Sequence, residues 1–172
     1  YPNAGVYILN LRQHPREFIR WLETALQAAR RLHDRQSEGN RLGNLGNAYL
    51  SLGEVRTAID YHEQALAIAR EIGDRRGEGN SLGNLGIAYK DLGEVRTAIG
   101  YYEQALAISR EIGDRRGEGS DLGNLGIAYY SLGETEKAIE FMEASLKIFE
   151  EIESPHANIV RRWLEELRGK SE

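Results

Sequence analysis

The sequence predicts an all-α protein built from consecutive pairs of antiparallel helices. Three observations lead to this fold class. The chain repeats itself every 40 residues, the apolar residues of each period follow helical spacing, and most glycines recur at fixed places in the period. With 172 residues the chain has the length of one ordinary domain, so we expect a single domain made of similar units.

The repeat is clearest in the middle of the chain. Residues 53–92 and 93–132 align without a gap and are identical at 33 of 40 positions. They differ only at Asp60/Gly100, His62/Tyr102, Ala69/Ser109, Asn80/Ser120, Ser81/Asp121, Lys90/Tyr130 and Asp91/Ser131. Residues 133–152 continue the register more loosely and residues 17–52 anticipate it.

Each unit is predicted to contain two helices. Over residues 75–92 the apolar residues fall within roughly 120° of arc, which is one buried face. Over residues 94–112 they cover a wider arc, as expected for a helix with neighbours on two sides. Asp74 is a suitable N-cap for the first helix, and Gly93 is suited to end it before Glu94, an acid in the first turn of the second.

Glycine is enriched to 19 residues, and sixteen of these occupy repeat positions. On the first helix Gly79, Gly83 and Gly86 fall on one side, where we expect the missing side chains to allow close helix packing. Each glycine in a helix costs about 1 kcal/mol relative to alanine, so this packing must compensate for the cost.

Both ends of the array are expected to be atypical. Pro15 begins a helix carrying Phe18 and Trp21, aligned with the second helix of a unit, and residues 2–13 are interpreted as a degenerate first helix. After Ser154 and Pro155, a last helix is expected to cover the final unit with its apolar residues Val160, Trp163, Leu164 and Leu167.

The predicted boundaries within the domain 1–172 are 1–34 (degenerate repeat), 35–73, 74–113 and 114–152 (units) and 153–172 (capping helix). Because the first residue is Tyr1, we expect the chain to be a piece of a longer protein.

Composition excludes several classes of function. The chain has no cysteine, so it has no disulfide, thiolate metal site or cysteine nucleophile, and we expect it in the cytoplasm. A net charge of −5 argues against nucleic-acid binding, and no apolar stretch approaches the ~20 residues that span a bilayer. We therefore expect neither nucleic acid nor membrane as a partner.

No catalytic or metal site is predicted. Residues 79–83 fit the pattern G-x-S-x-G of serine hydrolases, but the segment is helical and the counterparts of Ser81 are Arg41 and Asp121. His14, His33, His62 and His156 share no metal-ligand spacing. We expect no enzyme activity, no metal and no cofactor.

These residues resemble the tetratricopeptide repeat family. The signature occurs as Leu82-x2-Leu85-Gly86-x2-Tyr89 followed by Ala98, Tyr102 and Ala105, and it recurs in the units before and after. The long unit is similar to the 40-residue variant of Pins-type adaptors, kinesin light chains and the sensor arrays of bacterial and archaeal signalling ATPases of the STAND type. The resemblance implies a right-handed αα superhelix, a solenoid with a C-terminal capping helix, that acts as a non-catalytic scaffold for protein binding.

A candidate binding stripe lies on the first helix of each unit, opposite its core. Residues 76, 80, 84, 87 and 91 fall within roughly 80° of arc, and the resemblance implies that this stripe lines a concave groove. The candidate peptide-binding residues are Asn40, Asn44, Asn47, Arg76, Asn80, Asn84, Ile87, Arg116, Asn124, Ile127 and Tyr130.

The chemistry of the stripe suggests a peptide ligand. An asparagine amide offers a donor and an acceptor that match an extended main chain, and Asn44, Asn84 and Asn124 recur once per unit. Arg76 and Arg116 would favour an acidic residue or a C-terminal carboxylate. Two alternatives remain: the asparagines bridge neighbouring helices, or the array is structural and packs on other domains of a signalling ATPase or on a second copy through its open ends.

Overall fold

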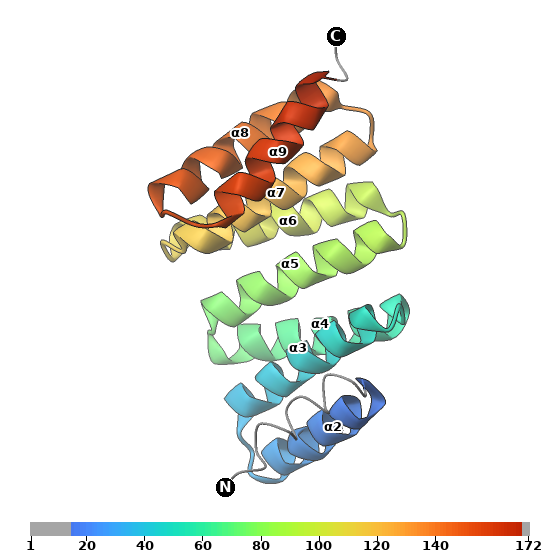
Figure 1. The fold of residues 1–172 in the computed structure, drawn as a ribbon. Helices are drawn as coiled ribbons and strands as arrows, with labels where there is room; N and C mark the ends of the chain where they lie inside the picture. Colours follow the sequence, from blue (N-terminus) through green and yellow to red (C-terminus); the bar gives the residue numbers. More distant parts are fainter. Residues whose placement is uncertain (1–14, 170–172) are drawn as a thin grey trace, which may run out of the picture. The chain divides into compact units, whose positions relative to one another are not determined.

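The computed structural model describes residues 15–169, which form eight α-helices and contain no strand (Figure 1). The helices are α2 (Pro15–Arg31), α3 (Arg35–Ser51), α4 (Val55–Ile72), α5 (Arg75–Asp91), α6 (Val95–Glu111), α7 (Arg115–Ser131), α8 (Thr135–Glu151) and α9 (His156–Gly169). By register α3, α5 and α7 are first helices, and α2, α4, α6 and α8 are second helices. The degenerate helix predicted at 2–13 lies outside the described residues.

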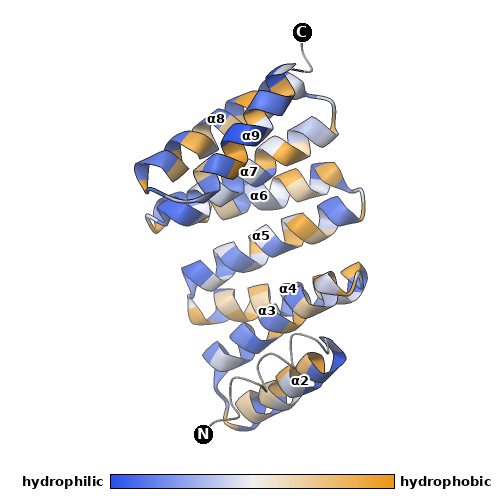
Figure 2. Cartoon of the chain, in the orientation of Figure 1, coloured by the Kyte–Doolittle hydropathy of each residue, from blue (hydrophilic) through white to orange (hydrophobic). Residues whose placement is uncertain are grey.

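The chain divides into two compact units, Tyr1–Gly77 and Glu78–Glu172, with the boundary in the first turn of α5. In the first unit α2 packs on α3 and α3 packs on α4. In the second unit α6 packs on α7, α7 packs on α8 and α8 packs on α9. Both units therefore consist of neighbouring helices in sequence order. Figure 2 shows hydrophobic and hydrophilic residues intermixed along each helix, as expected where one side is buried.

Helix ends follow the sequence closely. The side chains of Asp34, Asp74 and Asp114 accept hydrogen bonds from backbone N–H groups three residues further on, at 2.9–3.0 Å. The turns use left-handed backbone, with φ between +68° and +82° at Gly53, Gly73, Gly93, Gly113 and Gly133. One detail is corrected: Glu94 is the N-cap of α6 rather than a residue of its first turn, and its side chain makes no capping bond.

Partly buried ion pairs join a second helix to the first helix that follows it. Glu38 is only 7% exposed and accepts hydrogen bonds from Arg30, at the end of α2, and from Arg35, at the start of α3. Burial raises the pKa of Glu38, but these two arginines outweigh it and hold that pKa below its usual range. Glu118 has the same arrangement with Arg110 and Arg115 in the second unit. The charged carboxylate therefore ties a second helix to the first helix that follows it.

Each hairpin is closed by a glycine facing a large side chain. A Cβ atom on Gly46 would lie 2.5 Å from Cε1 of His62, and one on Gly86 would lie 2.4 Å from Cε1 of Tyr102. In the third hairpin a Cβ on Gly126 would lie 2.8 Å from Cγ of Met142. These distances are shorter than carbon atoms tolerate, so the three glycines are required by packing.

Not every helical glycine has this role. A Cβ on Gly79 would meet Cγ2 of Ile108 at 3.2 Å, which is tight. A Cβ on Gly83 would be 3.7 Å from Oδ1 of Asp121, an ordinary contact, and one on Gly43 would meet nothing within 4 Å. The expectation of close packing is thus confirmed for Gly86 and wrong for Gly83. At Gly79 the packing is tight but less close than at Gly86.

Two alanine substitutions in α3 test the closure directly. Gly46→Ala is expected to lower the free energy of unfolding by about 1–3 kcal/mol, because the added methyl group overlaps the His62 ring. Gly43→Ala, three residues earlier in the same helix, is expected to raise it by up to about 1 kcal/mol through helix propensity alone. Denaturant unfolding measures both, and equal effects at the two positions would contradict the packing argument.

Candidate functional site

The stripe on α3 presents three asparagines to solvent. Asn40, Asn44 and Asn47 are all exposed. Within residues 15–169 none of their side-chain amides forms a hydrogen bond. The amides of the first unit therefore have both donor and acceptor available to a ligand.

The second unit places its part of the stripe on α5 and α7. Asn84 and Asn124 are half-buried and Asn80 is exposed, and their amides also lack hydrogen bonds to any described residue. Ile87 and Ile127, one turn beyond the half-buried asparagines, are half-buried and pack against the core clusters of this unit. The second unit therefore carries a stripe of mixed polarity.

The capping helix contacts the end of this stripe. The ring of Tyr130 on α7 meets the ring of Trp163 on α9 edge-on, with centroids 6.4 Å apart. Tyr130 and Ile127 both pack against the cluster that α8 and α9 form, which includes Val160 and Leu164. The two residues predicted to contact a ligand thus already have apolar partners on one side, and the sequence did not indicate the contact with Trp163.

The two arginines of the stripe lie in the first turns of their helices. Arg76 is the second residue of α5 and Arg116 is the second residue of α7, and both are exposed. Arg76 makes an interaction within the protein. Because the predicted ladder from Asn44 to Asn124 belongs partly to each compact unit, its continuity remains a prediction.

The match of residues 79–83 to the serine-hydrolase pattern is not supported by the structure. Ser81 lies inside α5 and is only 6% exposed, so it has neither the turn nor the access that a nucleophile requires. No group of histidines and carboxylates suited to a metal ion occurs among the residues that the structure describes. In that same part of the chain no helix is long and apolar enough to cross a bilayer.

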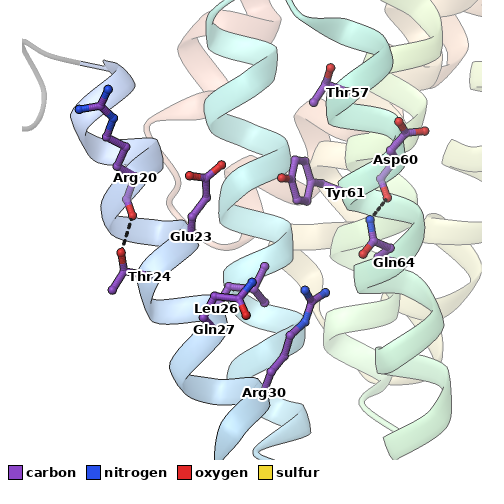
Figure 3. A pocket seen from close by; sticks show the side chains of 10 residues that line it. All are labelled: Arg20, Glu23, Thr24, Leu26, Gln27, Arg30, Thr57, Asp60, Tyr61 and Gln64. Atoms are coloured by element: carbon purple, nitrogen blue, oxygen red, sulfur yellow. Dashed lines mark hydrogen bonds between the residues drawn. The ribbon is translucent and has the colours of Figure 1, made fainter.

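A depression in the first unit lies between α2 and α4 (Figure 3). It is open, has a volume of about 840 Å³ and is lined mostly by polar residues of both second helices, together with Leu26 and Tyr61. Thr24 and Gln64 bond to the backbone of their own helices, and Arg30 pairs with Glu38. Three of its polar side chains thus have partners within the protein, and its charged residues are of both signs.

His62 is the most unusual buried group. It is fully buried against Gly46, and neither ring nitrogen has a hydrogen-bond partner. Burial lowers the pKa of His62 from 6.5 to about 4. Tyr102 and Met142 occupy the same position in the next two hairpins, and what the three residues share is a large side chain. We therefore interpret His62 as an uncharged residue that fills space in the core, and not as a functional base.

A buried hydrogen bond between side chains joins α6 to α7. The hydroxyl of Ser109 donates a hydrogen bond to Oδ2 of Asp121 at 2.8 Å, and both residues are 7% exposed. Burial raises the pKa of Asp121 to about 6, against the lowering effect of the Ser109 hydrogen bond. Sequence reasoning noted both positions only as differences between the repeats.

The helical repeats with glycine closures and capped ends define the class of protein. The family model described as tetratricopeptide repeat matches residues 15–71 and 77–151. The chain therefore belongs to the tetratricopeptide repeat family, and its fold class is the helical-repeat solenoid of that family. No curated protein sequence matches.

Solved structures share the fold at low sequence identity. A Rap protein complexed with Competence and Sporulation Factor is 19% identical with a TM-score of 0.76, over 97% of this chain and 46% of that one. The tetratricopeptide repeat sensor protein of the STAND class from Pyrococcus horikoshii is 24% identical with a TM-score of 0.79, over 92% and 25%. A putative kinesin light chain of Podosopora anserina is 22% identical with a TM-score of 0.73, over 92% and 81%. The chain spans less than half of the Rap protein and a quarter of the STAND protein.

Acid should destabilise the chain through His62. Its folded pKa of about 4 lies below the unfolded value of 6.5, so the unfolded state binds the proton first and stability falls as the pH decreases through this range. His62→Phe retains a ring of similar size without the titratable nitrogens. We expect its stability advantage over the unsubstituted chain to grow by about 2 kcal/mol from about pH 7.5 to about pH 5. Parallel pH profiles in denaturant unfolding would argue that His62 is solvated.

Proposed function

We propose that this chain binds an extended peptide along the first-helix stripe and has no catalytic activity. Membership of the tetratricopeptide repeat family supports the broader role of a protein–protein interaction module. The chain contains no cysteine, which fits the cytoplasm, and we propose that the peptide is bound there.

The observation that carries the proposal is the set of unpartnered asparagine amides. Asn44, Asn84 and Asn124 occupy one repeat position, are exposed or half-buried, and form no hydrogen bonds with described residues. A structural role as bridges between helices would require such bonds. An extended peptide presents N–H and C=O groups that planar amides can pair with, whatever its side chains are.

The side chains around the amides suggest the character of the ligand. Arg116, at the start of α7, is exposed and favours an acidic residue or a terminal carboxylate. Ile87 and Ile127 add apolar surface beside Asn84 and Asn124. The Rap protein of similar fold was solved with a bound factor, which is consistent with a ligand-binding role for this architecture.

A second candidate is an internal or self-associating scaffold. The STAND protein carries its tetratricopeptide repeats as a sensor within a much longer chain, of which this chain spans 25%. The near-identical units would also allow an open end of one copy to accept the matching face of another. In that case the asparagine stripe would face another domain or copy rather than a free peptide.

Removal of one amide tests the peptide proposal. A peptide selected from a displayed random library on this chain serves as the probe. Asn84→Ala is expected to weaken its binding roughly tenfold, since about two hydrogen bonds are lost, and to change the Tm by no more than about 2 °C. Gln104→Ala on α6, an exposed amide of a second helix, is the control and should bind normally. Strong destabilisation by Asn84→Ala would instead assign the asparagine to the fold.

Light scattering over a wide concentration range separates the two candidates. A chain that binds a peptide in its groove is expected to remain monomeric at the highest concentration. Growth of dimers or chains with concentration would favour the self-associating scaffold, and the effect should then depend on residues of α2 and α9, the terminal helices that the structure describes.

A further inference from the structure

Near-identical tandem repeats create a pairing problem during folding. The second helices α4 and α6 differ only at Asp60/Gly100, His62/Tyr102 and Ala69/Ser109 over their common positions. Either helix therefore offers almost the same surface to a following first helix. A chain in which α4 packed on α7, with α5 and α6 left out, would keep nearly all of the apolar contacts between those helices.

The buried hydrogen bond between α6 and α7 falls on two of the seven positions that distinguish the repeats. Ser109 replaces Ala69 of the preceding unit, and Asp121 replaces Ser81. The two residues that changed are direct partners, with Ser109 Oγ and Asp121 Oδ2 2.8 Å apart. They are a matched pair in space, although twelve residues separate them in sequence.

The remaining differences cannot discriminate between partners in this way. Tyr102 faces Gly86 of its own hairpin, and Gly100 is half-buried with open space beside it. On the first helix Ser120 and Ser131 are exposed and bond to their own backbone, and Tyr130 meets Trp163. Only the pair of Ser109 and Asp121 places a new buried polar contact between a second helix and the next first helix.

A mismatched pairing would be penalised by desolvation. If α4 took the place of α6, the methyl group of Ala69 would stand where the Ser109 hydroxyl donates. Ser109 is the hydrogen-bond donor that the described residues provide to the Asp121 side chain. The carboxylate would then be buried without its donor, which costs more than an ordinary lost hydrogen bond.

We propose that Ser109 and Asp121 form a register pair, a buried polar contact that specifies α6 as the neighbour of α7 and disfavours chains that skip a repeat. The pair acts on folding specificity and not on net stability, because a carboxylate buried without a cation contributes little or is unfavourable. Its role does not depend on the ligand of the asparagine stripe.

Two double variants built from the chain's own repeats test the proposal. S109A/D121S gives the α6–α7 junction the residues of the preceding repeat and deletes the pair. A69S/S81D keeps the pair and adds the same two residues to the preceding repeat, so that α4 also matches α7. Each variant is unfolded, refolded by rapid dilution and labelled by hydrogen exchange, and the mass distribution of residues 75–112 is recorded.

Chains that skip a repeat leave α5 and α6 unprotected, so they appear as a second, heavier population. We expect that population to rise roughly tenfold over the unsubstituted chain in both variants, while denaturant unfolding shows S109A/D121S to be at least as stable as the unsubstituted chain. An unchanged heavy population in both variants would overturn the proposal. So would a less stable S109A/D121S with normal refolding, since the pair would then be a stabilising contact only. Should S109A/D121S fail to fold, A69S/S81D decides alone.

Discussion

The structure depends on one steric constraint inside each hairpin: a large side chain of the second helix fills the volume that a Cβ of the first helix would occupy. His62, Tyr102 and Met142 lie over Gly46, Gly86 and Gly126, with hypothetical Cβ contacts of 2.4–2.8 Å. A glycine in mid-helix weakens the isolated helix, so it is retained where close packing compensates. The residue over the glycine can be aromatic, imidazole or thioether as long as it fills the space, which explains how a histidine without hydrogen bonds is accommodated.

This closure leaves the asparagines on one side of the first helices without hydrogen bonds to described residues. The apolar side of α5, with Leu82 and Leu85, is buried, and the glycine side faces the second helix. What remains is the stripe of asparagines, whose amides are not used within the described residues. Polar groups that the fold does not need are available for a partner, and they recur because the unit recurs. The proposed function is therefore a consequence of how the hairpin closes.

Much of this could be predicted from the sequence because the repeat supplies several copies of each signal. The helix bounds, the aspartate caps and the left-handed glycines follow from periodicity and local chemistry. The burial of Glu38 and Glu118 could not be predicted from the sequence. A glutamate in the first turn of a helix is expected to be solvated, and only the packing of the helices brings the arginines to it. The contact between Ser109 and Asp121 was visible only as two differences between repeats, and their proximity needed the three-dimensional arrangement. Gly83 was misassigned because the period alone does not distinguish a required glycine from a permitted one.

The central claim is that the asparagine stripe is the ligand-binding surface, and the side-chain amide signals in NMR test it most directly. Titration with the library-selected peptide should shift the NH₂ signals of Asn84 and Asn124 in a saturable manner, while the amide signals of Gln64 and Gln104 on the second helices stay in place. Saturable shifts confined to the second helices would contradict the account, because the ligand would then bind on the opposite side of the hairpins.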